Sequence, residues 1–513
     1  MDTDVVIVGS GIGGLCCGAM LARYGSRVTV CESHSIPGGA AHGFERLGYR
    51  FDSGPSLYSG LSHRPSTNPL RHVLDALGED LDWATYDRWG VSLPEGDFLT
   101  TVGADQFTEV LQNLGGLEAV RQWRSLQATM EPLGRAAISL PPAAVRPDWK
   151  AWRSIAPFIW KLIRQGPALA RLNGPFSAIM DRNVSDPFIR NWLDLLCFLL
   201  SGLPASGTSA AEMAFMFAEW YKPGVCLDYP IGGSAALVAA LERGLKSHGG
   251  DLRLRAHVDQ ILVEGGRAVG VRLNTGEIVT ASRAVISNAS IWDTLNLLPS
   301  GSLPPGFLHQ RAQIPPCPSF MHLHLGIDGA GLPPDLACHY IRVNDWQQGV
   351  DAPQNVVLIS IPSVLDPSLA PVGKHVIHVY TPGSEPYDLW QGLARGSPEY
   401  ADLKQQRSQV MWQALERVIP DIRQRCEVTL VGTPLTHERF LRRHHGTYGP
   451  GISAGDGFFP GHKTPIPGLL CCGDSTFPGI GLPAVAASGL ICAHGLVPVT
   501  QQLAMLRELD LMP

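Results

Sequence analysis

The sequence predicts an α/β fold whose central parallel sheet is assembled from distant parts of the chain. The first observation is an apolar, strand-like run at residues 4–8, followed by a glycine-rich turn and a small-residue helix. The second is an apolar run at residues 27–31 that ends at Glu32. The third is an apolar run near the other end that leads into Gly473 and Asp474. This order of strand, glycine turn, helix and acid-ended strand is that of a Rossmann-like nucleotide-binding domain.

The glycines of the first turn have separate physical roles. Gly9 permits the tight turn, and Gly11 lets the backbone approach a pyrophosphate. Gly14 lets the helix pack closely on the strand, while the free N–H groups of the helix start face the anion. Glu32 is placed to accept hydrogen bonds from a ribose hydroxyl, and its carboxylate would repel a 2′-phosphate. The turn therefore predicts a dinucleotide other than NADP.

The residues after Glu32 favour FAD over NAD. Residues 33–39 and 49–56 resemble the continuation of this motif in large two-domain flavoproteins. The strand that ends at Gly473-Asp474 suits an aspartate that reaches a ribityl hydroxyl. A Gly/Pro-rich turn then precedes a helix predicted at 484–496, whose N–H groups would stabilise negative charge on a reduced flavin. A Gly-Asp strand end alone could equally be a helix cap, but with the first motif it predicts bound FAD.

The composition restricts the partners. Charged residues make up 17% of the chain, against roughly 25% in typical soluble proteins, and hydrophobic residues make up 45%. This balance indicates a large apolar cavity or a face that meets lipid. The net charge of -6 argues against nucleic acid as a general partner. The 11 cysteines include no CxxC pair, which excludes a zinc ribbon and favours reduced thiols in an intracellular compartment. We expect neither a signal or transit peptide nor a transmembrane helix.

The chain divides into three predicted regions. A discontinuous FAD-binding domain comprises residues 1–62, 225–298 and 440–500. Residues 299–439 are expected to form an α+β substrate domain on an antiparallel sheet, with strands at 320–327, 356–361 and 375–380. Residues 63–224 are expected to form a helical lid that associates with a membrane. Within the FAD domain, a strand begins at Val258 and, in this fold class, commonly lies along the adenosine half of FAD.

Residues 146–171 carry six basic residues and one acid within an acidic protein. Trp149, Trp152 and Trp160 recur at helical spacing, while Lys150 and Arg153 belong to a separate basic stripe. Tryptophan beside a basic face suits a helix that lies in a membrane interface, although Pro157 must kink or interrupt it. The alternative is a helix packed on its own domain with solvated cations.

Two other patterns could hold a metal. His322 and His324 alternate with apolar residues on one predicted strand, which favours satisfied histidines in a sheet over a metal pair. His437-Glu438 lacks a second histidine at zincin spacing. The sequence therefore predicts no metal site.

Five segments together resemble bacterial-type phytoene desaturases and carotenoid isomerases, to which retinol saturases are related. These segments are residues 38–42, 51–56, 229–233, 432–440 and 473–479. The resemblance implies FAD, a peripheral membrane protein, and a C40 polyene drawn from a thylakoid, plasma or plastid membrane into an apolar tunnel. Isomerisation is the leading expectation, with desaturation or saturation as rivals. A flavin amine oxidase and a non-enzymatic prenyl-lipid-binding protein are two more functions to weigh, and Ala40, where amine oxidases often have arginine, weakens the former.

The candidate site residues follow from these motifs. His437, Glu438 and Arg439 could donate a proton or stabilise charge, or they could be salt-bridged residues of the surface. The candidate FAD-binding residues are Gly9, Gly11, Ile12, Gly13, Gly14, Glu32, Ser33, Gly38, Gly39, Ala40, Gly54, Pro55, Ser56, Val258, Gly473, Asp474, Gly481, Leu482 and Pro483.

Overall fold

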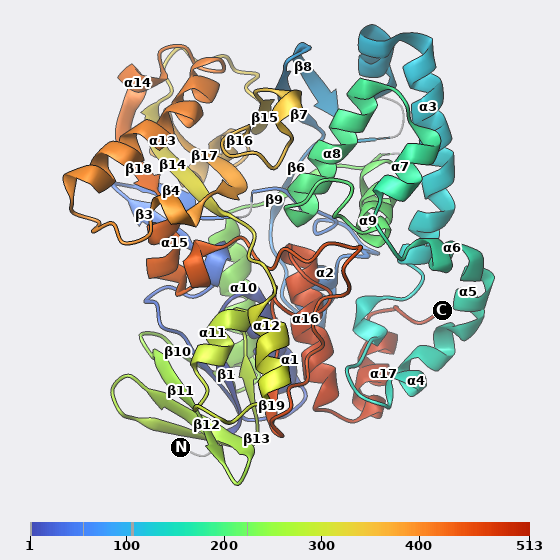
Figure 1. The fold of residues 1–513 in the computed structure, drawn as a ribbon, viewed down its shortest axis with the longest axis vertical. Coiled ribbons are helices and arrows are strands. Elements are labelled where there is room, and N and C mark those ends of the chain that lie inside the picture. Colours follow the sequence, from blue (N-terminus) through green and yellow to red (C-terminus); the bar gives the residue numbers. More distant parts are fainter. Residues whose placement is uncertain (1–2, 55, 104–106, 223) are drawn as a thin grey trace.

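A computed structural model describes residues 3–54, 56–103, 107–222 and 224–513. Pro55, one of the candidate FAD-binding residues, therefore lies outside the described residues. Figure 1 shows two sheets, one above the other, with a helical region along one side of both. The N-terminus lies at the foot of the lower sheet, and the C-terminus lies beside the helices α4 and α5.

The lower sheet is the predicted nucleotide-binding sheet, and its strands come from three distant parts of the chain. Its strand order is β10-β2-β1-β13-β12-β11, with β19 paired to β13. The pairs that join β10, β2, β1, β13 and β19 are parallel, which brings their carboxyl ends to one edge. The strands are β1 (Thr3–Val8), β2 (Val28–Cys31), β10 (Asp251–Arg253), β11 (Val258–Glu264), β12 (Arg267–Leu273), β13 (Ile278–Ser287) and β19 (Leu469–Cys471). The α/β class and the Rossmann-like sheet are thereby confirmed.

Helices from both ends of the chain cover this sheet. α1 packs against α16 and α10, and Gly489 of α16 permits the close approach to α1, because a Cβ at this position would lie 2.3 Å from the carbonyl oxygen of Gly13. The helices are α1 (Ile12–Arg23), α2 (Pro69–Leu77), α10 (Ser234–Ser247), α16 (Leu482–Gly495) and α17 (Val499–Glu508).

The upper sheet has the order β18-β14-β17-β16-β15-β7-β8. One face, with Leu323 and Val379, packs on the helix α13 (Pro398–Glu416) in an apolar core. The opposite face turns toward the FAD domain. The strands are β7 (Arg88–Leu93), β8 (Gly96–Thr101), β14 (Ser319–Asp328), β15 (His339–Val343), β16 (Val356–Ser360), β17 (Lys374–Glu385) and β18 (Cys426–Gly432).

The region expected to be helical, residues 63–224, differs from that expectation in its first part. It contains β7 and β8, and also β6 (Trp83–Tyr86), which pairs with β9 (Leu227–Pro230). The β7–β8 hairpin extends the substrate sheet because β7 pairs in parallel with β15, a contact between segments about 250 residues apart. The remainder is helical: α3 (Phe107–Ala137), α4 (Ala151–Ile155), α5 (Ile159–Arg164), α6 (Gly166–Arg171), α7 (Ser177–Asn183), α8 (Pro187–Ser201) and α9 (Ala210–Trp220).

The basic tryptophan segment is interrupted, which is one of the two outcomes expected at Pro157. Pro157 and the Gly166-Pro167 pair divide it into α4, a 3-10 turn, α5 and α6. Arg146 is not part of its surface, because this buried side chain pairs with Asp148 and donates to the side-chain oxygen of Gln502. Among the described residues, none of the helices has both the length and the apolarity that crossing a bilayer requires.

Candidate active site

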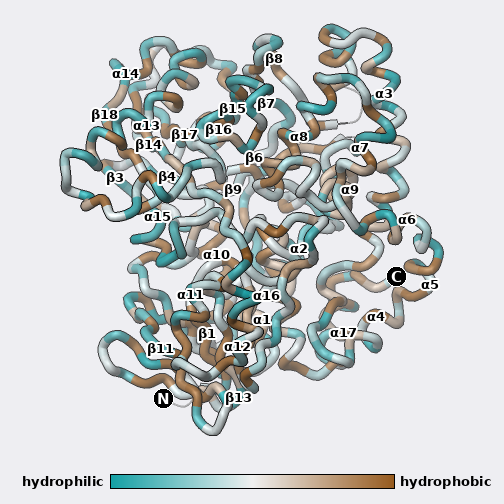
Figure 2. The backbone as a smooth tube through the Cα atoms, in the orientation of Figure 1, coloured by the Kyte–Doolittle hydropathy of each residue, from teal (hydrophilic) through white to brown (hydrophobic). Residues whose placement is uncertain are grey.

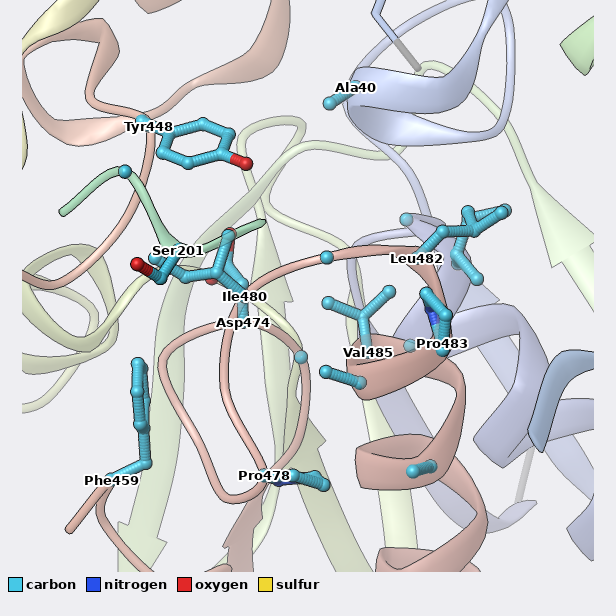
Figure 3. A pocket seen from close by; sticks show the side chains of 18 of the residues that line it. Ala40, Ser201, Tyr448, Phe459, Asp474, Pro478, Ile480, Leu482, Pro483 and Val485 are labelled. Carbon is cyan, nitrogen blue, oxygen red and sulfur yellow. The ribbon is translucent and has the colours of Figure 1, made fainter. Parts of the chain in front are cut away.

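A cavity of about 1150 Å³ lies where the FAD domain, the substrate sheet and the helical region meet. One part is walled by the carboxyl edge of the parallel sheet and the start of α16, as Figure 3 shows for Asp474, Ile480 and Leu482. The candidate FAD-binding residues that line it are Gly9, Gly11, Ile12, Gly13, Glu32, Ser33, Gly38, Gly39, Ala40, Gly54, Ser56, Val258, Gly473, Asp474, Gly481, Leu482 and Pro483.

The glycine turn between β1 and α1 is a cradle that side chains would fill. A Cβ on Gly11 would lie 2.8 Å from the side-chain nitrogen of Asn288, and one on Gly13 would lie 2.9 Å from the Cα of Gly473. Gly14 does not line the cavity, because it packs α1 on the strand: its Cβ would lie 2.3 Å from the carbonyl oxygen of Gly9. A backbone this open at a helix N-terminus fits a pyrophosphate.

Glu32 lies at the carboxyl end of β2 and is held in one orientation. Its Oε2 accepts hydrogen bonds from the Ser10 N–H at 2.8 Å and the Ser10 hydroxyl at 2.6 Å, and its Oε1 accepts from the His34 N–H at 2.7 Å. The carboxylate is buried and faces the same cavity as Asp474. The two acids that the sequence assigned to one nucleotide therefore lie on one site, although they are far apart in the chain.

Asp474 forms an ion pair with Arg443, and this partner was not anticipated from the sequence. Arg443 also donates to the carbonyl oxygen of Tyr448 at 2.8 Å, so it ties the 442–448 segment to the cavity wall. Two non-glycine residues of that segment, Arg442 and His445, have φ values of 51° and 50°. Left-handed backbone of this kind costs energy in non-glycine residues and is often found at functional sites.

Asn288 was also missed. It follows Ser287, the last residue of β13, and its side chain lies within 4 Å of the position that a Cβ would occupy on Gly9, Gly11, Gly13 or Gly473. A usable signal was present, because a polar residue directly after a buried parallel strand lies at the edge where such sheets bind ligands.

The rest of the cavity is mainly apolar and lies between the substrate sheet and the helical region. Leu162, Leu169 and Leu172 line it from α5, α6 and the residue after α6, with further apolar residues from α8 and α9. Two acids on this wall already have partners. Glu212 accepts from the N–H and hydroxyl of Ser209 at 3.0 and 2.9 Å, and Glu219 accepts from Lys222 at 3.1 Å.

The three candidate catalytic residues do not lie together. His437 lines the cavity and stacks on Phe320, with ring centroids 5.4 Å apart. Glu438 accepts from the Tyr387 hydroxyl at about 3.0 Å, outside the residues that line the cavity. Arg439 is exposed over the ring of Phe440. Of the three, His437 alone is placed to contact a ligand in this cavity.

His322 and His324 are joined by His378 of the neighbouring strand, and ring nitrogens of the three lie within 4.8 Å of one another. His324 is satisfied, since its Nε2 bonds the carbonyl oxygen of Asp52 at 3.1 Å. His322 is only partly satisfied: its Nδ1 lies 2.7 Å from His378 Nε2, and its Nε2 has no partner among the described residues. Alternation in the sequence placed two of these rings on one face but could not reveal the third.

Comparison with known proteins agrees with this geometry. Residues 12–497 match the family described as flavin containing amine oxidoreductase. A chloroplastic prolycopene isomerase of Daucus carota is 32% identical over 508 residues, covering 96% of this chain and 80% of that protein. A neurosporene-forming phytoene desaturase of Cereibacter sphaeroides is 27% identical, and the alignment covers 96% of this chain and 94% of the desaturase. The solved structure of an oxidoreductase from Methanosarcina mazei has a TM-score of 0.63 at 20% identity, over 96% of this chain and 99% of that one.

The sequence motifs, the cradle and the comparisons thus support the same conclusion. Glu32, Asp474 and the glycine turn form a site that fits FAD, and the matched family spans nearly the whole chain. The chain belongs to the flavin-containing amine oxidoreductase family and is an enzyme whose cofactor is FAD.

Proposed function

We propose that this protein is a carotenoid cis–trans isomerase that takes its polyene from a membrane. The observation that carries the proposal is one cavity of about 1150 Å³, whose lining includes both the nucleotide cradle and the apolar residues of α5, α6, α8 and α9. The similarity to prolycopene isomerases over 96% of the chain supports isomerisation over the rival reactions, desaturation and saturation.

The chain's own residues have two tasks in this function. The glycine turn, Glu32 and Asp474 hold FAD, with the start of α16 placed beside it. The bound flavin supplies hydride chemistry at a double bond. The apolar walls align the polyene and exclude water, which raises the effective concentration of the reacting atoms.

The segment of residues 149–171 is proposed as the membrane-binding surface and the route of entry. Trp149, Trp152 and Trp160 are 74%, 61% and 72% exposed, and Lys161 and Arg164 are exposed beside them. In Figure 2 apolar and hydrophilic stretches alternate along this outer edge of α4 and α5. Aromatic rings with cations suit the headgroup region of an anionic membrane. The inner side of the same segment, at Leu162 and Leu169, lines the cavity, so a polyene could pass from lipid to the site over a short path.

An amine oxidase would need a polar pocket for a cationic substrate. Glu212 and Glu219 are the acids on the apolar wall, and both are engaged by neighbours. The Glu219 carboxylate pairs with Lys222 and the Glu212 carboxylate accepts hydrogen bonds from Ser209, so neither of these described acids lacks a partner, which favours an apolar substrate.

The test is anaerobic incubation of the FAD-loaded protein with poly-cis and all-trans lycopene in liposomes, with oxidised or reduced flavin. Isomerisation conserves the number of double bonds, whereas desaturation raises it and saturation lowers it, so product absorbance and mass separate the three. We expect isomerisation with reduced flavin. No conversion of either polyene under either condition would refute the proposal.

A further inference from the structure

A short connection after the helix α15 (Pro434–Leu441) borders the FAD cradle, although α15 itself packs on β14 and β18 of the upper sheet. Figure 1 shows α15 between the two sheets. Residues 440–443 line the cavity together with the glycine turn of the lower sheet. Residues 440–444 form a crossing segment, and their contacts show its path.

The crossing segment passes the carboxyl end of β1. At its start, the ring of Phe440 lies edge-on to His34, which follows β2, with centroids 5.6 Å apart. At its end, the N–H of His444 donates to Asp293 at 3.0 Å, in the helix α11 (Ile291–Asn296) that follows β13. Because β1 lies between β2 and β13, the middle of the segment, at Arg442, passes the glycine turn that follows β1.

The cavity contains few positive charges at the place where an anionic cofactor would bind. Among the described residues that line it, Arg442 and Arg443 are the side chains with a permanent positive charge. Each phosphate of the FAD pyrophosphate is negative, and the N-terminus of α1 offers only about half a positive charge. The acids that line the same part of the cavity are Glu32, Asp293 and Asp474.

Of the two arginines, Arg443 already has partners. It pairs with Asp474 and donates to the carbonyl oxygens of Thr447 and Tyr448. Arg442 is exposed, and its guanidinium has neither an ion pair nor a hydrogen bond among the residues that the structure describes. The Arg442 guanidinium is therefore available to a ligand.

The backbone at Arg442 supports a role beyond the fold. Arg442 caps the C-terminus of α15 with a φ of 51° and a ψ of 43°, which is left-handed backbone. Helices that end in this way usually have glycine or asparagine there, because the Cβ of most other residues is disfavoured. The competing explanation is that the cation only stabilises the C-terminal end of the helix, where positive charge is favourable.

We propose that Arg442 binds the pyrophosphate of FAD. The glycine turn supplies backbone N–H groups to this anion, and Arg442 supplies the positive charge that the cradle lacks. A planar guanidinium matches phosphate oxygens with two parallel N–H bonds, which a lysine does not. Since α15 packs on the upper sheet, the cofactor thereby joins the two sheets. This role concerns FAD alone, whichever reaction the enzyme catalyses.

The first test is Arg442→Gln, which removes the charge. Titration of the FAD-free protein with FAD, followed by flavin fluorescence, should give binding about tenfold to a hundredfold weaker, as for loss of charge-assisted hydrogen bonds. The matched control is Arg255→Gln. Arg255 is also an exposed arginine in left-handed backbone, with a φ of 57°, and its N–H donates to the carbonyl oxygen of His34 at 3.0 Å.

Arg255 does not line the cavity, so its substitution should leave FAD affinity unchanged. Equal FAD affinities for the two glutamine variants would overturn the proposal. Because the measurement is one of FAD affinity, this result would leave the proposed isomerase function intact.

The second test determines which part of FAD contacts Arg442. Wild-type protein without FAD should bind ADP more tightly than adenosine, because only ADP carries the pyrophosphate. Arg442→Gln should weaken the binding of ADP by about the same factor as that of FAD and leave the binding of adenosine unchanged. An equal loss for ADP and adenosine would place Arg442 on the ribose or the adenine, and equal wild-type affinities would show no cation at the phosphates; either result would refute the proposal.

The third test separates binding from helix stability. In Arg442→Asn the charge is lost, but asparagine adopts left-handed backbone readily. We expect the melting temperature of the FAD-free protein not to fall, while FAD binds at least about tenfold more weakly. If the melting temperature fell and FAD bound as tightly as to the wild type, Arg442 would serve only the end of α15 and the proposal would be wrong.

Discussion

The charge on the proposed membrane-binding surface can be removed without disturbing the cavity. Lys150, Arg153, Lys161 and Arg164 form no ion pair among the described residues, so their charge is available to a partner. Lys150 is half-buried and the other three are exposed. Substitution of all four by glutamine is the perturbation.

The expected loss of binding to anionic vesicles follows from the attraction between these cations and the negative surface of the bilayer. Each cation near such a surface contributes about 1 kcal/mol, so four contribute about 4 kcal/mol, or about a thousandfold in binding. The effect should weaken as salt rises, because the screening length falls from about 10 Å at 0.1 M to about 3 Å at 1 M. Binding to zwitterionic vesicles should change little.

Cosedimentation with vesicles that contain anionic lipid, at 0.1 M salt, measures this loss. The matched control replaces four exposed arginines on other elements by glutamine: Arg46, Arg50, Arg88 and Arg272. A second variant, Trp152→Ala with Trp160→Ala, should weaken binding to both vesicle types, because each ring buried in the interface contributes up to about 1.5–3 kcal/mol. If the glutamine variant bound anionic vesicles within fivefold of the wild type, or if the control lost as much, the surface would be wrongly assigned.

Three further outcomes are expected. Gly13→Val should abolish FAD binding, because its Cβ would lie 2.9 Å from the Cα of Gly473. Flavin absorbance and titration measure this loss. The control Gly306→Ala, with open space around the new Cβ, should bind FAD as the wild type does. Arg407→Met should cost about 3–5 kcal/mol in urea unfolding, since it leaves the fully buried Glu385 carboxylate without its bidentate partner, and adding Glu385→Gln should recover part of that loss. Histidines kept neutral by burial stabilise the fold above their unfolded pKa of 6.5, and this contribution is lost as pH falls toward their lowered pKa values, about 4 for His324 and about 3 for His437. The melting temperature should therefore fall steeply between about pH 6 and pH 4. Each such histidine lowers the free energy of unfolding by up to about 1.4 kcal/mol per pH unit, so the fall should be less steep in His324→Gln. The histidines concerned are His322, His324, His339, His378, His437 and His494.

The residues proposed to hold FAD could be grouped from the sequence because each motif is local, and most of them line one cavity in the structure. Glu32 and Asp474 each follow a short apolar strand, and parallel strands bring their carboxyl ends to one edge. Asn288 obeys the same rule after β13 and could have been found by it. The Arg443–Asp474 pair could not, because it depends on how a loop after α15 folds back across the cavity.

The helical region shows a different limit. Residues 63–224 were expected to be helical, and α3, α8 and α9 agree with that expectation, but the β7–β8 hairpin is defined by its partner β15, about 250 residues further on. A short amphipathic hairpin has only marginal stability by itself, and the strand that stabilises this one lies far away in the sequence. Similarly, Trp149, Trp152 and Trp160 are exposed as expected, whereas Arg146 is buried, and Pro157 and Pro167 divide the segment into short pieces.

The cluster of His322, His324 and His378 illustrates why a site on a sheet is harder to predict than one at a strand end. Period-two alternation places His322 and His324 on one face, yet their chemistry depends on which residue lies across from them. That residue is fixed by register: a shift of one position in β17 would move His378 to the apolar face and bring Val379 or Ile377 to the cluster. The register is in turn held by the apolar face packed on α13, where Leu323 and Val379 are fully buried. The core on one side of the sheet thus determines which histidines meet on the other, and a substitution in that core that shifted the register would remove the His322–His378 bond without touching either ring.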